Sequence, residues 1–419
     1  MHLARISWRN LRRNMVRTSI AVLAVTTVVV IVIFARALMV GSVDSSFRMY
    51  IDNSFGHVRI TEREYQRREP LLPLRYTIDG FDGSGAEEMI GQIEHIDSVE
   101  HVLPRIRFAV TAEAGNGFLR MIGVGVDPAR ETAYGALPGD IQEGRMPQTG
   151  DEILLGLGLS EELEAGLGST VTVTFADTGQ AQHHRTLEVV GIAEAGVAGL
   201  DNRFFYLPLQ TAWDMLQLQD QVTELLVFAS DARRASALYA DLTDLLERRN
   251  GGQYTAVIWN QADPFVEFFY EMTKIMDLVY VMFILMGSVV IITTLTMIVR
   301  ERTREIGVMA ALGLKGRDIM KVFLLEGAYM GLVGSLLGAV AGGLITRHYS
   351  QAGLHAEDFA RLSADMDLLI EPVFYLAHNA ENLIISFALG LIVVVLACLY
   401  PAFRAARLEP VDALHHIDE

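Results

Sequence analysis

The segment with the most suggestive chemistry is RERTREIGVMAALGLKGRDIMK, residues 300–321, which lies between two long apolar runs. Its acidic and basic side chains could form ion pairs with a partner protein. We predict a short helix over residues 303–313 that ends at Gly313, because glycine is favoured just past the last helical turn. Asp318 then suits the positive end of the next helix. Such a stiff charged helix could transmit a push from another protein. The alternative is an interfacial helix that only stabilises the loop.

The apolar run that follows this segment contains glycines at a spacing of four residues, in two ladders. Small residues at this spacing let two helix backbones approach closely in a membrane. We therefore predict that this span packs tightly against another helix, and we take the ladders as one reason to expect a dimer. The predicted helix-packing residues are Gly327, Gly331, Gly334, Gly338 and Gly342.

Motifs for catalysis and cofactor binding are absent from the sequence. There is no G-x-x-x-x-G-K-[ST] phosphate loop, no C-x-x-C, no H-E-x-x-H and no G-x-S-x-G. GVGVD, residues 123–127, is predicted to lack the following helix that a dinucleotide site requires. His183 and His184 are neighbours that would point to opposite faces of a strand, so we predict exposed polar residues rather than a metal site. We predict no catalytic, cofactor or metal residues.

Four uncharged runs are each long enough to cross a bilayer, for which roughly 18 residues are needed. For any one of these runs, the alternative is a helix buried in a protein core. The first run could instead be a cleaved signal peptide, but it is longer than the ~7–15 apolar residues of a signal peptide. A chain that is 51% hydrophobic with a mean hydropathy of +0.30 fits a few spans plus a water-soluble part. The runs are 18–35, 278–299, 327–346 and 383–402.

Basic residues cluster before the first run, in the 300–326 loop and after the fourth run, whereas residues 347–382 are acidic. The positive-inside rule therefore predicts cytoplasmic termini and an external segment at 41–275. A net charge of −17 argues against a nucleic-acid partner. The single cysteine, Cys398, excludes a disulfide within the chain, so the external domain needs its own core.

The predicted fold class is an α-helical membrane protein with four transmembrane helices and a large extracytoplasmic α/β + β domain between the first and second spans. Alternating strands and helices flank a glycine-rich β segment, which indicates an α/β subdomain interrupted by a β subdomain. The predicted parts are a cytoplasmic amphipathic elbow helix at 1–17, a first span with its extension at 18–50, an extracytoplasmic domain at 51–271 (α/β parts about 51–128 and 208–263, β-rich insert about 129–207), and a membrane domain at 272–419 with spans at about 276–299, 327–346 and 383–402 and the helix at 303–313.

Several segments resemble the FtsX-like permeases, the MacB/Lol type of ABC transporter. RERTREIGVMAALGLKGRDIMKVFLLEG resembles the family's coupling-helix signature, and YPAFRAARLEPVDAL resembles its C-terminal ending. RISWRNLRRNMVRTSIAVLAV resembles the N-terminal elbow and first span, and GRMPQTGDEILLGLGLSEELEAGLGSTVTV resembles the β-rich periplasmic subdomain. SFGHVRITEREYQ is similar to the lipoprotein-releasing branch. Together the matches cover both ends and the middle of the chain.

The resemblance implies that the helix at 303–313 couples the chain to a separate dimer of ABC ATPase subunits, which bind ATP and Mg, so that this chain needs no cofactor. It also implies a second permease subunit, either another copy or a paralogue. Glu305 is the predicted polar contact, and Met309 and Leu312 are predicted to fill a groove. The full set of predicted ATPase contacts is Arg304, Glu305, Ile306, Gly307, Met309, Ala310, Leu312 and Gly313.

The resemblance further implies mechanotransmission, in which ATP-driven motion reaches the external domain through the spans without substrate crossing the bilayer. Lipoproteins are the first expected substrate, in the inner membrane with the large domain in the periplasm. MacB-like efflux of amphiphilic drugs or peptides is an alternative, as is FtsX-like signalling to a cell-wall hydrolase, whose external domain is usually shorter. An exported, membrane-anchored enzyme has no catalytic constellation in this sequence to support it.

Overall fold

The structure is a computed structural model, and it describes residue 9 and residues 15–114, 117–135, 137, 141–194, 201–250, 252–261, 264–301, 303–311, 314–355 and 373–406. The chain divides into two compact units. Among the described residues, the helical unit comprises 15–44, 269–355 and 373–406, and the sheet unit comprises 45–268. Most of the predicted elbow helix at 1–17 lies outside the described residues.

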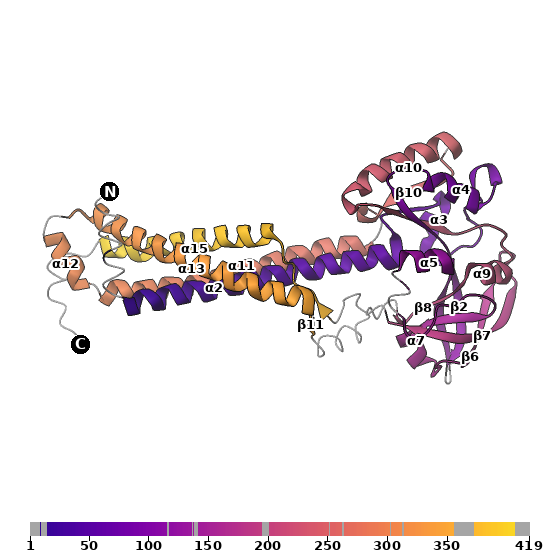
Figure 1. Cartoon of the computed structure of the whole chain (residues 1–419), viewed down its shortest axis with the longest axis horizontal. Coiled ribbons are helices and arrows are strands. Elements are labelled where there is room, and N and C mark those ends of the chain that lie inside the picture. The colour runs from indigo at the N-terminus through magenta and orange to yellow at the C-terminus, as the bar shows by residue number, and fades with distance from the viewer. Residues whose placement is uncertain are drawn as a thin grey trace. The chain divides into compact units, whose positions relative to one another are not determined.

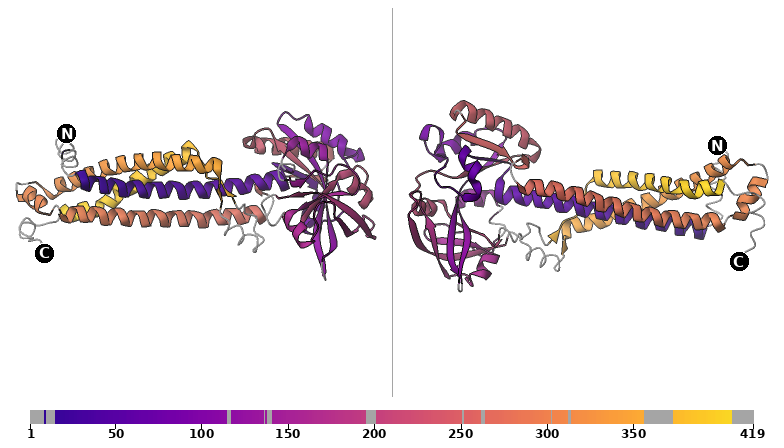
Figure 2. Two further views of the ribbon diagram at one scale, coloured as in Figure 1. Left: turned by 60° about the horizontal axis from the view of Figure 1, so that its bottom comes forward. Right: turned by 180° about the vertical axis from the view of Figure 1, so that it is seen from behind.

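The helical unit is built from four long helices that run side by side (Figures 1 and 2). Each is long and apolar enough to cross a membrane, so the described part of the chain confirms the predicted four spans. A short helix, α12 (Thr303–Ala311), lies at one end of the unit between α11 and α13. The long helices are α2 (Met15–Tyr50), α11 (Pro264–Glu301), α13 (Gly316–Ala352) and α15 (Ala380–Ala406), and the two-residue strands β11 (Leu354–His355) and β12 (Val373–Phe374) pair before α15.

The strands of the sheet unit form one ten-stranded sheet, in the order β10-β1-β9-β2-β3-β8-β5-β7-β4, with β6 paired to both β2 and β7. Most neighbours are antiparallel, but β3–β8 and β5–β7 are parallel. The strands are β1 (Val58–Glu62), β2 (Val99–Ala114), β3 (Gly117–Val126), β4 (Ile141–Gly144), β5 (Glu152–Gly156), β6 (Thr170–Ala176), β7 (Gln182–Ala193), β8 (Phe204–Pro208), β9 (Glu224–Ala229) and β10 (Tyr254–Ile258).

The pairing of β6 with β2 closes a ring of six strands, β2-β3-β8-β5-β7-β6. Strand β2 is 16 residues long, and its first part pairs with β9 while its later residues 110–112 pair with β6. The ring thus includes the β2–β3 hairpin as well as strands from the predicted β-rich insert at about 129–207. The β2–β3 hairpin is shared, because one long strand belongs both to the open sheet and to the ring.

Helices α4, α9 and α10 contribute to one large core of the sheet unit. Met89 and Ile93 of α4, Met215 of α9 and Leu242 of α10 are buried there. Within the six-strand ring, the phenyl group of Phe108 occupies the space that a side chain at position 123 would need. A Cβ atom added at Gly123 would lie 2.4 Å from Phe108 Cζ. The helices are α3 (Arg63–Arg68), α4 (Ala86–Glu94), α5 (Pro128–Tyr134), α7 (Leu157–Glu162), α9 (Leu209–Leu216) and α10 (Ala235–Asn250).

The prediction that no helix follows GVGVD is wrong. Helix α5 starts immediately after this segment, and the Asp127 carboxylate accepts hydrogen bonds from the backbone N–H groups of Ala129 and Arg130. An aspartate before a proline is a strong helix start that the glycine spacing obscured. The segment still lacks the third glycine of the dinucleotide fingerprint, and β3 pairs antiparallel with β2.

Candidate functional site

Helix α12 is attached to the ends of three long helices through one buried side chain. Ile306 is fully buried in a cluster with Val299 of α11, Ile319 and Phe323 of α13 and Ala402 of α15. Thr303 Oγ1 donates to the Arg300 carbonyl oxygen at 2.7 Å, which ties the start of α12 to the end of α11. A displacement of α12 would therefore disturb this cluster and the helix ends that form it.

Some of the residues predicted to contact the ATPase are buried in the structure. Ile306 and Gly307, two of the predicted ATPase contacts, are buried by the chain's own helices and do not face a partner in this arrangement. Met309 is half-buried against the same cluster, so it is only partly available. Val308, a large apolar residue of α12, is 45% exposed and was not predicted.

The other predicted contacts are only partly described. Arg304, Glu305 and Ala310 lie on α12, although the description does not extend to their side chains. Leu312 and Gly313 lie outside the described residues. The next helix begins at Gly316, and Asp318 is in its first turn. Ala311, the last residue of α12, is exposed, as are Lys315 and Arg317 farther along the chain.

The second glycine ladder of α13, formed by Gly334, Gly338 and Gly342, lies against α2. Cβ atoms added at Gly334, Gly338 and Gly342 would lie 2.6 Å from Val25 Cγ1, 2.7 Å from Val29 Cβ and 3.1 Å from Ile33 Cβ. The two sets of three residues share the same four-residue spacing. The Thr26 hydroxyl also donates to the Gly334 carbonyl oxygen at 3.3 Å, which indicates how near the two backbones are.

The first glycine ladder of α13, formed by Gly327 and Gly331, lies against a different helix, α15. Added Cβ atoms would lie 2.3 Å from Cys398 Sγ at Gly327 and 2.8 Å from Val394 Cγ1 at Gly331. Each ladder glycine thus has a neighbour within its own chain. The ladders therefore give no support to the expected dimer, because sequence spacing identifies a close-packing face but not the helix that covers it.

Alanine at Gly338 should destabilise the helical unit by about 1–3 kcal/mol, because the new methyl group has no room beside Val29. Gly343→Ala is the matched control on the same helix, since its Cβ would lie 3.5 Å from Leu383, an ordinary contact distance. Thermal unfolding of the full chain in detergent measures both. Equal effects of the two alanines would contradict this packing. Gly338→Leu should be more harmful still.

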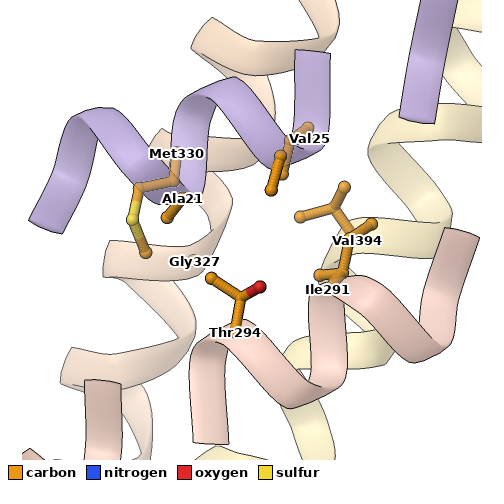
Figure 3. A pocket seen from close by; sticks show the side chains of 8 residues that line it. Ala21, Val25, Ile291, Thr294, Gly327, Met330 and Val394 are labelled. Carbon is orange, nitrogen blue, oxygen red and sulfur yellow. The ribbon is translucent and has the colours of Figure 1, made fainter. Parts of the chain in front are cut away.

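A small gap remains where all four long helices meet (Figure 3). Its lining includes Ala21 and Val25 of α2, Ile291 of α11, Met330 of α13 and Val394 of α15. The room for the centre of a water molecule is about 10 Å³, and the lining is apolar. The one hydroxyl at its edge, on Thr294, donates to the Val290 carbonyl oxygen. The gap is therefore a dry packing defect rather than a ligand site.

A second polar feature, which the sequence reasoning missed, lies where α2 ends in the sheet unit. A single π-helical turn, Ile51–Phe55, follows α2, and it contacts the sheet face that carries buried charges. Arg105 Nη1 donates to the Asn53 carbonyl oxygen at 2.5 Å, and Tyr134 donates to Asp52 at 2.6 Å. The guanidinium of Arg59 stacks 4.2 Å from the Phe55 ring centre.

Six charged residues on this face, here called the buried ion network, pair with one another: Arg59, Glu69, Arg105, Arg107, Glu131 and Glu224. Arg59 binds both oxygens of Glu69 at 2.6 Å, and Arg105 binds Glu131 Oε1 at 3.0 Å. Arg105 and Glu224 stand opposite each other in the β2–β9 register. Burial lowers the pKa of Arg105, but the charges of Glu131, Tyr206 and Glu224 and the hydrogen bond to Glu131 together outweigh burial and raise that pKa.

Stability should depend on pH through Glu69. Burial raises the pKa of Glu69, but Arg59 and Arg107 outweigh burial and hold this pKa below its ordinary 4.5. The ionised form is therefore favoured by folding, so its stabilisation is present above pH 4.5 and is lost as pH falls through the lowered pKa. The stability difference between wild type and Glu69→Gln, measured by urea unfolding, should shrink in that acidic range. Glu64→Gln, at an exposed ion pair, should have a small effect throughout.

The described residues contain no group of three or more His, Cys, Asp or Glu side chains arranged to hold a metal ion. His183 Nε2 lies 2.8 Å from Asp177 Oδ2, while His184 Nδ1 lies 2.8 Å from the Thr174 hydroxyl. The two neighbouring histidines thus bind separate partners. His415 and His416 are outside the described part.

Two family models match the chain. The MacB-like periplasmic core domain matches residues 14–245, more than half of the chain, and the FtsX-like permease C-terminal domain matches residues 278–410. The first covers α2 and most of the sheet unit, and the second covers α12, α13 and α15 together with most of α11.

Individual relatives match at lower identity. The lipoprotein-releasing system transmembrane protein LolC of Neisseria meningitidis serogroup B is 27% identical over 63% of this chain and 65% of its own length. The macrolide export ATP-binding/permease protein MacB of Nitrobacter winogradskyi is 27% identical over 77% of this chain and 48% of its own. The chain thus spans less than two thirds of either relative. The solved periplasmic region of MacB from Actinobacillus actinomycetemcomitans aligns with 48% of this chain and 88% of its own at 15% identity, with a TM-score of 0.35, too low to support an argument.

Proposed function

The chain belongs to the FtsX-like permease family of the MacB/Lol type, and from that premise we propose that it is the permease subunit of an ABC transporter acting by mechanotransmission. In this proposal a separate ATPase dimer binds ATP and Mg and pushes on α12. The observation that carries the proposal is the burial of Ile306 among the ends of three long helices. That contact would turn a push on a nine-residue helix into a shift of the bundle.

The glycine ladders supply the next step of this proposal. Helix α13 starts beside α12 and lies against α2 through Gly334, Gly338 and Gly342. Helix α2 continues to Tyr50, and the turn after it is bound by the buried ion network of the sheet unit. Motion of α13 would reach the sheet unit along α2. Close-packed helices transmit such shifts because their interfaces resist gradual deformation.

We further propose that α12 and both chain termini are cytoplasmic and that the sheet unit is periplasmic, in a cell inner membrane. The basic residues of the 300–326 loop and those that precede α2 support this orientation. A second permease subunit, another copy or a paralogue, would complete the transporter. Cysteine labelling from each side of sealed vesicles tests the topology, and labelling of Lys315→Cys from the outside would contradict it.

Lipoproteins are the proposed substrate, extracted or released at the outer face of the membrane. The similarity to a protein named as lipoprotein-releasing supports this choice. Drug or peptide efflux is the second candidate, because the relative named for macrolide export aligns over a larger share of this chain. The two candidates therefore need a direct comparison.

The test is reconstitution of the chain with its co-purifying ATPase in liposomes. A fluorescent triacylated lipopeptide should stimulate ATP hydrolysis and leave the bilayer, whereas a macrolide should do neither. Stimulation by the macrolide alone would favour the efflux candidate. Robust ATP hydrolysis by the chain without any ATPase subunit would contradict the whole proposal.

A further inference from the structure

A small pocket opens on the sheet face that carries the buried ion network. It lies between Asn53 of the turn after α2, Arg107 of β2 and Glu224 of β9, with Val124, Phe204 and Tyr206 completing its wall. The room for the centre of a water molecule is about 20 Å³. One water molecule needs about 10–15 Å³ by this measure, so the pocket has space for a single water.

Three side chains at this pocket have buried polar atoms without hydrogen-bond partners in the described structure. Glu224 is 1% exposed, and neither of its carboxylate oxygens accepts a hydrogen bond. Its nearest cations, Arg59 and Arg107, are 3.6 and 3.9 Å away, beyond good hydrogen-bond distance. Asn53 Oδ1 and Arg107 Nε are also buried and unpartnered. Leaving such groups unsatisfied is strongly unfavourable, so these polar atoms favour binding of a small hydrogen-bonding ligand in the pocket.

We propose that this pocket binds one ordered water molecule, which donates hydrogen bonds to the Glu224 carboxylate and to Asn53 Oδ1 and accepts one from Arg107 Nε–H. Water offers two donors and two acceptors, which matches this set of groups. An ammonium group could not accept from Arg107. An anion could not donate to Glu224 and would be repelled by it.

The water would add a further link among three elements, the turn after α2, strand β2 and strand β9, beside the β2–β9 backbone pairing and the Arg105–Asn53 hydrogen bond. The turn after α2 would then be held in two ways. The Arg105–Asn53 hydrogen bond is a direct contact, and the water would form a second contact that can exchange with solvent. A water-mediated bond is nearly as favourable as a direct one but tolerates small shifts of its partners. The observations that support this water do not depend on the proposed transport function.

The experiment is X-ray hydroxyl-radical footprinting of the full chain in lipid nanodiscs, with rapid mixing into ¹⁸O-labelled water. Radicals from a bound water oxidise adjacent aromatic rings, so Tyr206 should be oxidised although it is only 7% exposed. Its uptake of ¹⁸O should lag behind that of Phe118, which is 77% exposed and reports bulk water. Tyr254, 2% exposed with its hydroxyl bonded to Asp79, should stay unmodified.

Val124→Leu should fill the pocket and reduce Tyr206 oxidation severalfold. Val126→Leu is the matched control, because it adds the same methylene on the same strand at a position that does not line the pocket. An equal loss in both variants would overturn the proposal. So would a wild-type Tyr206 that is as inert as Tyr254, or one that exchanges as fast as Phe118. The wild-type measurement decides the question even if a variant fails to fold.

Discussion

Replacing Val308 by aspartate is expected to abolish substrate-stimulated ATP hydrolysis while the chain remains folded. Val308 is a large exposed apolar side chain of α12, next to residues that the chain itself buries. A charge placed in an apolar contact is strongly unfavourable, and a loss of about 3 kcal/mol would weaken ATPase binding roughly a hundredfold. The measurements are stimulated ATPase activity in the reconstituted complex and co-purification of the ATPase.

Two further variants sharpen this test of the α12 surface. Glu305→Lys reverses the charge of the predicted polar contact and should give the same defect. Leu71→Asp is the matched control, because Leu71 is 76% exposed and belongs to the sheet unit, whereas α12 belongs to the helical unit. If Val308→Asp and Glu305→Lys both retain full association and stimulation, α12 only stabilises the loop and the coupling assignment fails.

Arg105→Met should lower the free energy of unfolding of the sheet unit by about 3–5 kcal/mol, because it leaves a buried carboxylate without its cation. Glu131 is 1% exposed and is paired with Arg105, which also binds the Asn53 carbonyl oxygen. Urea unfolding of the full chain in detergent, followed by the fluorescence of Trp213 and Trp259, measures this loss. The turn after α2 would also lose its direct attachment, so stimulated ATP hydrolysis should fall as well.

Arg130→Met provides the comparison for this buried pair. Arg130 forms ion pairs with Glu87 and Glu94 but is 22% exposed, so its loss should cost less than about 1 kcal/mol. The double variant Arg105→Met/Glu131→Gln removes both charges and should recover much of the stability. A single Arg105→Met variant that is no less stable than Arg130→Met would show that the buried ion network does not hold the unit together.

The four spans were predictable from the sequence because length and lack of charge are local properties that no distant contact changes. The side of α12 that packs against the long helices was not predictable from the sequence. A nine-residue helix with apolar residues on several sides does not reveal whether Ile306 or Val308 faces the bundle. That choice is made by Val299, Phe323 and Ala402, which come from three other helices.

The sheet unit was only partly predictable for a related reason. Alternating patterns located the strands, but they did not show that Arg59, Arg105 and Arg107 are buried or half-buried. Their burial depends on carboxylates from three different segments, Glu69, Glu131 and Glu224, which the fold brings together. The closing pair β2–β6 likewise joins residues far apart in sequence, and no local signal specifies it.

The position of β1 in the sheet has a consequence for the order in which the chain folds. This strand is made early but pairs with β9 and β10, which are the last strands of the sheet unit to be synthesised. Contacts of such large sequence separation form slowly. Residues 58–62 must therefore wait, with their backbone groups unpaired, until almost the whole unit has emerged. A chaperone that shields this segment during synthesis would act on the unit at its most aggregation-prone stage.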